Sequence, residues 1–395
     1  MTAEKIDFSL FGNYTEQKVP DGIIYRPCDN DCCFELHGVT IGIGFHWQRQ
    51  ENQRFHGALQ IIQRATSQTA INILDIEDYL ESVISSEMAA TSSLELLKTH
   101  AIISRSWAVN AINSKACSQP STADISQSRI MRFYERDAHQ DFDVCADDHC
   151  QRYQGLSRIV SDLVHLAVSQ TRGLVLTSDG QLVDARFYKC CGGATELFEN
   201  VWANRHHPYL IAQRDFTDRE LPNLTDEQTA RQWIMSAPQA FCNTHDRQVL
   251  KQVLNNYDQE TPDFYRWKVE YSQDELSEIV HHKSGIDFGK IVDLRPIRRG
   301  QSGRLIELQI VGTKRSLCVG KELEIRKWLS ASHLYSSAFI VERDENNGFI
   351  LIGAGWGHGV GLCQIGAAMM AQNGYDHKAI LQHYFPDTTI EQLKN

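Results

Sequence analysis

Residues 75–112 read DIEDYLESVISSEMAATSSLELLKTHAIISRSWAVNAI, and a helical period begins here. Apolar side chains in the first half recur at the three- and four-residue spacing of one helix face, namely at Ile76, Leu80, Val83 and Ile84. Ser92 followed by Glu95 predicts a capping box at the start of a second helix, which ends near Ile112. The two helices are expected to meet around Glu87 and Met88.

Short alternating stretches on both sides of these helices predict antiparallel strands. Residues 40–45 (TIGIGF) and 59–62 (LQII) indicate a small β layer within residues 20–75. Residues 173–177 and 182–188 predict a hairpin joined through Asp179 and Gly180, whereas the polar residues 115–156 are expected to be loop-like. Further strands are predicted at residues 305–311, 339–342 and 349–354, and further helices at residues 227–235 and 274–282.

Composition limits the class of partner. The 395-residue chain carries 50 acidic and 39 basic side chains, a net charge of -11, and no dense run of Lys or Arg. Because nucleic-acid binding depends on neutralising phosphates, we expect no nucleic-acid partner. No apolar stretch approaches the roughly 18 to 20 residues of a membrane span, and residues 1–10 are too polar for the core of a secretory signal. We therefore expect no integral membrane segment.

Residues 353–361 (GAGWGHGVG) place glycine at every second position. In an extended conformation one face of this segment would carry no side chains, so a polymer or a neighbouring backbone could lie on it. The opposite face would present His358 between hydrophobic side chains. The alternative is a tightly packed core strand with a hydrogen-bonded histidine. A helix from Cys363 to Asn373, closed by Gly374, should follow.

Glu87 stands at the end of the apolar face of the first predicted helix. Partial burial there would raise the pKa of its carboxyl group and keep it protonated near neutral pH, as a glycosidic acid requires. The alternative is a solvated or capping glutamate, which is the ordinary state of Glu near helix ends.

A short polar loop, HQDFDVCADDHC, brings together four nitrogen and sulfur ligands, His139, Cys145, His149 and Cys150. This set suits tetrahedral Zn²⁺, and because four protein ligands leave no open position, such a zinc would be structural. A Cys145–Cys150 disulfide or free thiols are the alternatives. The 11 cysteines of the chain include the adjacent pair Cys190 and Cys191, which we interpret as packed thiols.

Residues 74–112 and 355–390 (GWGHGVGLCQIGAAMMAQNGYDHKAILQHYFPDTTI) together resemble the SpoIID/LytB family, known for sporulation and cell-wall glycan cleavage. The two motifs occur in the expected order near opposite ends of the chain, and a looser resemblance spans most of residues 35–390. The resemblance implies an α+β fold, with an antiparallel β framework, helices packed around a glycan cleft, and an inserted lobe. The implied division is residues 20–204 and 301–395 for the two parts of the SpoIID-like domain and 205–300 for the lobe.

The resemblance also assigns residues. It implies Glu87 as the catalytic residue and Arg105 as its companion in the following helix. The residues it places along the glycan cleft are Tyr188, Thr195, Glu196, Gly357, His358, Gly359 and Gln364. Some members are similar in carrying zinc in the loop described above.

Two departures from the family pattern concern the shape of the groove. Members commonly follow the Glu-Met pair with Pro and a nearby Trp, where this chain has Ala89 and Ala90. They commonly carry Ser before the Gln, where this chain has Cys363. Neither departure removes the expected acid.

The implied activity is that of a lytic transglycosylase, which needs one carboxyl group where ordinary glycosidases pair two. It would cleave between N-acetylmuramic acid and N-acetylglucosamine and leave a 1,6-anhydro sugar. The alternative from the same family is a non-catalytic, glycan-binding enhancer of a wall amidase, with other wall hydrolases as partners. A zinc amidase or protease is disfavoured because the loop's ligand set is closed and no HExxH pattern occurs. A cell-envelope location is expected from the substrate, although no leader is readable.

Overall fold

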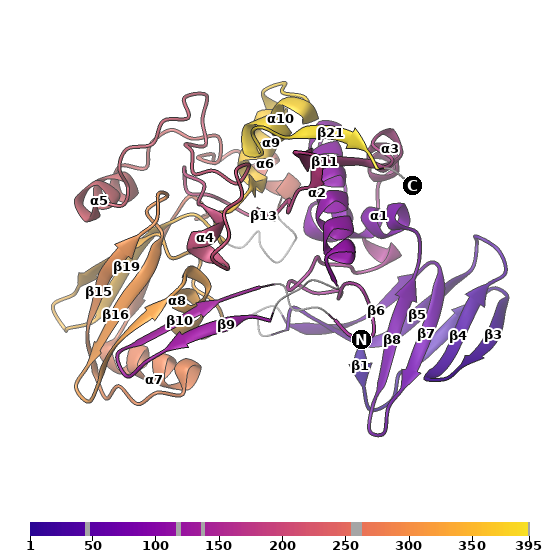
Figure 1. The fold of residues 1–395 in the computed structure, drawn as a ribbon, viewed down its shortest axis with the longest axis horizontal. Coiled ribbons are helices and arrows are strands. Elements are labelled where there is room, and N and C mark those ends of the chain that lie inside the picture. Colours follow the sequence, from indigo (N-terminus) through magenta and orange to yellow (C-terminus); the bar gives the residue numbers. More distant parts are fainter. Residues whose placement is uncertain (44–47, 116–119, 136–138, 254–262, 394–395) are drawn as a thin grey trace.

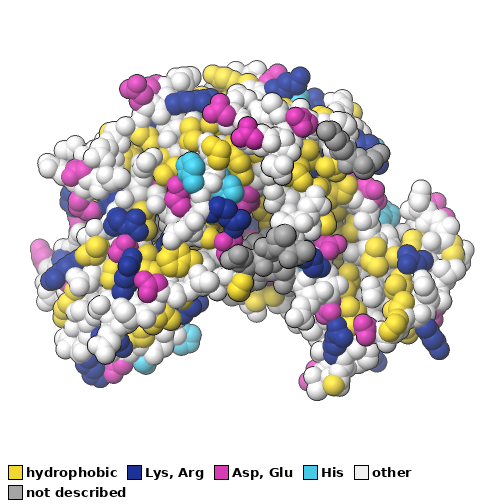
Figure 2. All heavy atoms as spheres, in the orientation of Figure 1, with side chains coloured by type: hydrophobic (Ala, Val, Ile, Leu, Met, Phe, Trp, Pro, Cys, Tyr) yellow, Lys and Arg dark blue, Asp and Glu magenta, His cyan; other side chains and the backbone are white. Residues whose placement is uncertain are grey.

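Two β-rich lobes flank a helical middle in the computed structural model, which describes residues 1–43, 48–115, 120–135, 139–253 and 263–393 (Figure 1). The N- and C-termini both lie on the side of the N-terminal lobe. The space-filling view in the same orientation shows an open hollow between the two lobes, below the central body (Figure 2).

The N-terminal lobe is built from two antiparallel sheets with strand orders β1-β8-β7-β4-β3 and β2-β5-β6. The strands are β1 (Thr2–Ala3), β2 (Phe8–Phe11), β3 (Tyr14–Val19), β4 (Gly22–Pro27), β5 (Cys33–Ile41), β6 (Arg49–Phe55), β7 (Ala58–Gln63) and β8 (Gln68–Ile73). The strand predicted at residues 59–62 is confirmed as part of β7. The one predicted at 40–45 is the end of β5 as far as Ile41, and residues 44–45 lie outside the described part of the chain.

The helical middle contains α1 (Ile76–Glu87), α2 (Leu94–Asn113) and α3 (Asp162–Gln170), with the short 3-10 helix η2 (Leu156–Arg158). Asp75 caps α1 by accepting from the backbone N–H of Glu77, which explains why the helix begins there. The predicted Ser92 capping box is wrong. The N-cap is Ser93, without a side-chain cap bond, while the Ser92 hydroxyl donates to the backbone oxygens of Ala89 and Gln252.

The predicted hairpin is confirmed at its turn but not in its length. β11 (Leu174–Ser178) pairs with β12 (Gln181–Leu182) through Asp179 and Gly180, whose φ values of 50° and 72° are those of a tight hairpin turn. β12 is short because the chain then leaves this sheet. Residues Phe187–Tyr188 form β13, which pairs in parallel with β20 (Leu362–Cys363). On its other edge, β11 pairs with β21 (Thr389–Gln392).

The second lobe holds the sheets β15-β16-β17-β10-β9 and β14-β19-β18. The strands are β9 (Thr122–Ile125), β10 (Arg129–Phe133), β14 (Arg266–Tyr271), β15 (Ile291–Arg299), β16 (Leu305–Gly312), β17 (Ser316–Gly320), β18 (Phe339–Arg343) and β19 (Phe349–Ala354). The expectation of a loop throughout residues 115–156 is wrong, because β10 pairs in parallel with β17. β9 is exposed along its whole length and so lacks the alternation that marks a half-buried strand.

The remaining helices are α4 (Phe198–Val201), α5 (Glu227–Ser236), α6 (Arg247–Val253), α7 (Gln273–Ser284), α8 (Glu322–Trp328), α9 (Gln364–Gln372) and α10 (His377–Tyr384). The predicted helices at 227–235, 274–282 and 363–373 are confirmed as α5, α7 and α9, and Gly374 follows α9 with a φ of 86°. The chain is thus an α+β protein with mainly antiparallel sheets. The division at residues 205 and 300 stays a prediction, and β14 and β15 pair with β19 and β16 from beyond residue 300. Among the described helices, none has the length and apolar content that crossing a membrane requires.

The glycine-rich segment does not form the predicted strand with a side-chain-free face. β19 ends at Ala354, and the four glycines that follow have φ values of 78°, 105°, 88° and 84°, at Gly355, Gly357, Gly359 and Gly361. This left-handed backbone region favours glycine. The packing is also tight, since a Cβ on Gly359 would lie 2.5 Å from the guanidinium carbon of Arg304. Neighbouring protein atoms occupy the space that a polymer would need.

Candidate functional site

Glu87 is the last residue of α1 and its side chain is half-buried. Its Oε1 accepts a hydrogen bond from the backbone N–H of Arg152 at 2.9 Å. Burial raises the pKa of the Glu87 carboxyl group above its usual value, although the positive charges of Arg152 and Lys189 act in the opposite direction. The position at the negative end of the α1 dipole acts in the same direction as burial. The carboxyl group therefore has the environment expected of an acid that keeps its proton.

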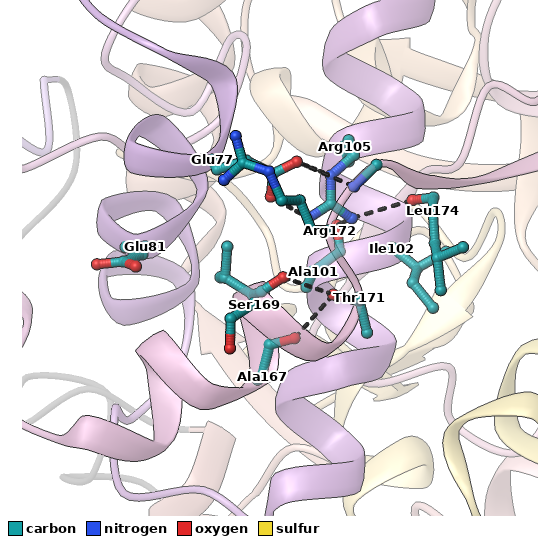
Figure 3. A network of polar contacts seen from close by, with 12 residues as sticks. Glu77, Glu81, Ala101, Ile102, Arg105, Ala167, Ser169, Thr171, Arg172 and Leu174 are labelled. Atoms are coloured by element: carbon teal, nitrogen blue, oxygen red, sulfur yellow. Dashed lines mark hydrogen bonds and ion pairs between the residues drawn. The ribbon is translucent and has the colours of Figure 1, made fainter. Parts of the chain in front are cut away.

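Arg105 does not lie beside Glu87. Its side chain is completely buried and forms a bidentate ion pair with Glu77, with Nη2–Oε2 and Nε–Oε1 distances of 2.5 Å and 3.0 Å (Figure 3). Nη1 donates to the backbone oxygen of Leu174 at 3.0 Å. Glu77 lies in the first turn of α1, and Glu87 lies at its end. At a helical rise of about 1.5 Å per residue, the two residues are about 15 Å apart along the helix axis. Arg105 thus joins α1, α2 and the start of β11, and the structure gives it no contact through which to orient Glu87.

The four residues of the predicted metal loop are brought together. The ligand atoms of His139, Cys145, His149 and Cys150 all lie within 4.8 Å of one another. Nε2 of His139 is 3.3 Å from Sγ of Cys150, and Nδ1 of His149 is 3.5 Å and 4.0 Å from Sγ of Cys150 and Cys145. Hydrogen bonds from Cys150 and His149 lower the pKa of the Cys145 thiol to about 3, which favours the thiolate that a metal binds. Cys145 and Cys150 are not joined to each other by a disulfide. The group can hold a metal ion.

This loop is also joined to the end of α1. Arg152, which donates to Glu87, follows Cys150 by two residues, and its Nε donates to Oδ1 of Asp148 at 2.6 Å. The backbone N–H of Gln154 donates to Oγ of Ser86 at 3.2 Å. The candidate metal ligands and the hydrogen-bond donor to Glu87 therefore belong to one hydrogen-bonded segment.

His358 is held as a neutral imidazole. Its Nε2 lies 3.1 Å from the backbone oxygen of Phe187 and donates to it, so Nδ1 accepts from the backbone N–H of Val360. Burial lowers the pKa of His358 well below its usual value. Its ring contacts that of Tyr188, with centroids 5.0 Å apart. The Tyr188 hydroxyl is buried and has no hydrogen-bond partner within the described part of the chain.

The structure buries three residues that the family resemblance places in the cleft. Thr195, Glu196 and Gln364 are all at most 2% exposed. Oε2 of Glu196 accepts from Oγ of Ser302 at 2.6 Å, and Oε1 accepts from Nδ2 of Asn200 at 2.8 Å. Gly359 is buried as well, and its backbone oxygen accepts from the N–H of Glu196. These residues organise the interior, and their role in glycan binding stays a prediction.

Sequence reasoning missed a pocket of about 580 Å³ near the C-terminal end of α2. Its lining includes Trp107, Asn110, Phe133, Asp184, Arg186 and Arg205. These residues come from separate segments of the chain, so no local pattern announces the pocket. Glu87 is not part of its lining.

Comparisons with known proteins are consistent with the arrangement of α1, α2 and the metal loop. Residues 64–178, which include α1, α2 and the metal loop, match the family model described as Stage II sporulation protein. Residues 196–361 match a family model described only as a domain of unknown function (DUF8618). The fold and these matches together indicate a protein with a cell-wall-related function.

Three related proteins give further information on the family. The Stage II sporulation protein D of Bacillus subtilis is 24% identical over 332 residues, which cover 84% of this chain and 78% of that protein. The amidase enhancer of Bacillus subtilis is 23% identical over 332 residues, 79% of this chain but 40% of that protein. An uncharacterised protein of Brachyspira hyodysenteriae is 24% identical over 370 residues, 94% of this chain and 76% of its own. The matched family model and these relatives support the SpoIID-family assignment that the motifs predicted.

Proposed function

We propose that the protein is a peptidoglycan lytic transglycosylase in which Glu87 acts first as the acid and then as the base. The observation that supports this role is the half-buried carboxyl group at the end of α1, whose pKa burial raises. A raised pKa increases the fraction of the carboxyl group that is protonated at a given pH, which favours its use as an acid.

In the proposed reaction Glu87 donates its proton to the glycosidic oxygen between N-acetylmuramic acid and N-acetylglucosamine, and the bond from that oxygen to C1 breaks. The resulting carboxylate then takes the proton of the muramic C6 hydroxyl as O6 bonds to C1. The N–H of Arg152 stabilises the carboxylate between these steps, since hydrogen bonding to a charged form favours it. No water is consumed, and one carboxyl group serves both steps.

The test is the product released from purified glycan strands, both with and without stem peptides. Lytic transglycosylase activity predicts 1,6-anhydromuramic ends, detected by mass spectrometry. Reducing ends formed by addition of water would indicate a hydrolase and would contradict the proposed mechanism.

We further propose that His139, Cys145, His149 and Cys150 hold a structural Zn²⁺. Zinc bond lengths of about 2.3 Å to sulfur and about 2.0 Å to nitrogen place tetrahedral ligands roughly 3.3–3.8 Å apart. Two of the three nitrogen–sulfur separations in the loop, 3.3 Å and 3.5 Å, fall in this range, and the third, 4.0 Å, is slightly longer. Protein purified without added zinc should contain the metal, and Cys150→Ser should lose one equivalent. Finding a Cys145–Cys150 disulfide in its place would overturn this assignment.

A second candidate is a glycan-binding enhancer of a wall amidase. It is favoured by the similarity to a protein named amidase enhancer. The matched region covers 40% of the length of that protein. An enhancer would bind glycan strands and stimulate a wall amidase without releasing anhydro ends. In that case Glu87→Gln would leave the stimulation unchanged.

A further inference from the structure

A second group of potential metal ligands lies in the interior, apart from the metal loop. It consists of Cys191, Asp215, Cys242 and Cys363, whose ligand atoms all lie within 4.8 Å of one another. All four residues are buried. They come from four separate parts of the chain: Cys191 follows β13, Cys363 is the N-cap of α9, and the other two lie in intervening loops.

The separations fit ligands of one ion. Sγ of Cys191 lies 3.2 Å from Sγ of Cys242 and 3.3 Å from Oδ2 of Asp215. A disulfide would require about 2.05 Å between the sulfurs, whereas tetrahedral zinc ligands stand roughly 3.3–3.8 Å apart. The 3.3 Å separation falls in this range, and the 3.2 Å separation between the two sulfurs is slightly shorter. A cluster of several irons would hold its outermost cysteines farther apart, because bridging sulfides separate the metals.

The surrounding donors suit anionic ligands. The backbone N–H of Gly193 lies 3.3 Å from Sγ of Cys191, and the N–H of Cys191 lies 3.2 Å from Sγ of Cys363. The hydroxyl of Tyr384 donates to Oδ1 of Asp215 at 2.7 Å, and the backbone N–H of Cys242 donates to Oδ2 at 3.0 Å, which leaves one lone pair of Oδ2 for the ion. Such secondary hydrogen bonds orient the ligands of metal sites.

The buried carboxylate also requires a compensating positive charge. Nε2 of His383 is 3.7 Å from Oδ1 of Asp215, beyond hydrogen-bond distance, and has no hydrogen-bond partner among the described residues. A divalent cation bound between this carboxylate and the thiolates would place a positive charge directly beside Asp215.

We propose that Cys191, Asp215, Cys242 and Cys363 form a second, buried structural site for a single Zn²⁺. Three sulfurs and one oxygen are a tetrahedral set for zinc and leave no position for substrate. The ion links two parts of the protein, since Asp215 and Cys242 lie within residues 196–361, which match the domain of unknown function, and Cys191 and Cys363 lie just outside them. This site does not depend on glycan cleavage.

The test uses full-length protein in which Cys145→Ser and Cys150→Ser remove the loop ligands. Metal analysis should still find about one zinc per chain, and adding Cys242→Ala should remove it. Cys32→Ala is the matched control, because Cys32 is equally buried but directly precedes β5 in the N-terminal lobe, outside the four-ligand group. It should retain the metal.

A second measurement avoids dependence on the folding of the Cys242→Ala variant. Cobalt introduced into the Cys145→Ser, Cys150→Ser protein should give the absorption of tetrahedral Co²⁺ bound to thiolates. Absence of both zinc and the cobalt signal from this folded protein would overturn the proposal. So would a Cys191–Cys242 disulfide found by mass spectrometry of the unreduced wild-type protein.

Discussion

The backbone N–H of Arg152 lies 2.9 Å from Oε1 of Glu87, so the segment that carries the candidate metal ligands also contacts the candidate acid. Cys150 is two residues away from this donor. In the proposed mechanism this arrangement gives the metal loop a positioning role without contact between the metal and the substrate.

The pH profile of cleavage should show the raised pKa of Glu87. Only the protonated carboxyl group can act as the acid, so the rate should fall as pH rises through this pKa, at a higher pH than for an ordinary glutamate. Lys189 lowers the pKa through its charge, and Lys189→Met should therefore move the falling limb to higher pH. The measurement is the initial rate of anhydro-product release against pH. An unchanged or downward shift would contradict the assignment.

Arg105 should contribute to the stability of the folded protein and not to catalysis. Arg105→Met leaves Glu77 buried without its partner and should lower the free energy of unfolding by about 3–5 kcal/mol, measured by urea denaturation. A Glu77→Leu, Arg105→Met double variant should recover part of the loss. Activity per folded molecule should be retained. Lost activity at full stability would instead restore a catalytic role for Arg105.

His100 should make the protein less stable in acid. It is completely buried, neither ring nitrogen has a hydrogen-bond partner within the described residues, and burial lowers its pKa to about 3. Between about pH 6.5 and this pKa the unfolded chain binds a proton that the folded protein does not, so stability falls as pH falls.

The measurement is urea denaturation of the wild type and His100→Leu at several pH values. The slope attributable to one such group is at most about 1.4 kcal/mol per pH unit, and it should be missing from the variant. Other buried histidines titrate in both proteins, so the difference isolates His100. Parallel pH dependences would show that His100 does not titrate in this way.

Gly359 should be intolerant of a side chain because of packing. Gly359→Ala adds a Cβ 2.5 Å from the Arg304 guanidinium, at a φ of 88°. Gly180→Ala is the matched control, since Gly180 has a φ of 72° but nothing within 4 Å of the added Cβ. Both variants carry backbone strain of about 1–2 kcal/mol, and overpacking should add about 1–3 kcal/mol in Gly359→Ala alone. Equal losses in thermal or urea unfolding would contradict this explanation.

Local patterns predicted the local features well. The periodicity of residues 76–84 identified α1, and the spacing of four residues between His139 and Cys150 identified potential metal ligands that the fold brings together. Both depend on residues close in sequence. The side chain of Ser92 was misassigned because its partner, the backbone oxygen of Gln252, is far away in the chain.

Features that depend on distant contacts were missed or misread. Alternating glycines in residues 353–361 fit an extended strand, but four of them have positive φ values, and atoms of the distant residues Tyr188, Cys190 and Arg304 lie close to where their Cβ atoms would be. The pairing of β10 with β17 joins segments nearly two hundred residues apart. The buried group around Asp215 becomes visible only when four separate parts of the chain converge.

The most direct test of the central proposal compares the wild type and Glu87→Gln on the same purified glycan strands. Gln keeps an oxygen for the Arg152 N–H but cannot donate the proton, so binding and thermal stability should be retained. Release of 1,6-anhydromuramic ends should fall by a factor of about 10²–10⁴. Equal release by both proteins, or none by the wild type on any strand preparation, would contradict the role of Glu87 as the catalytic acid.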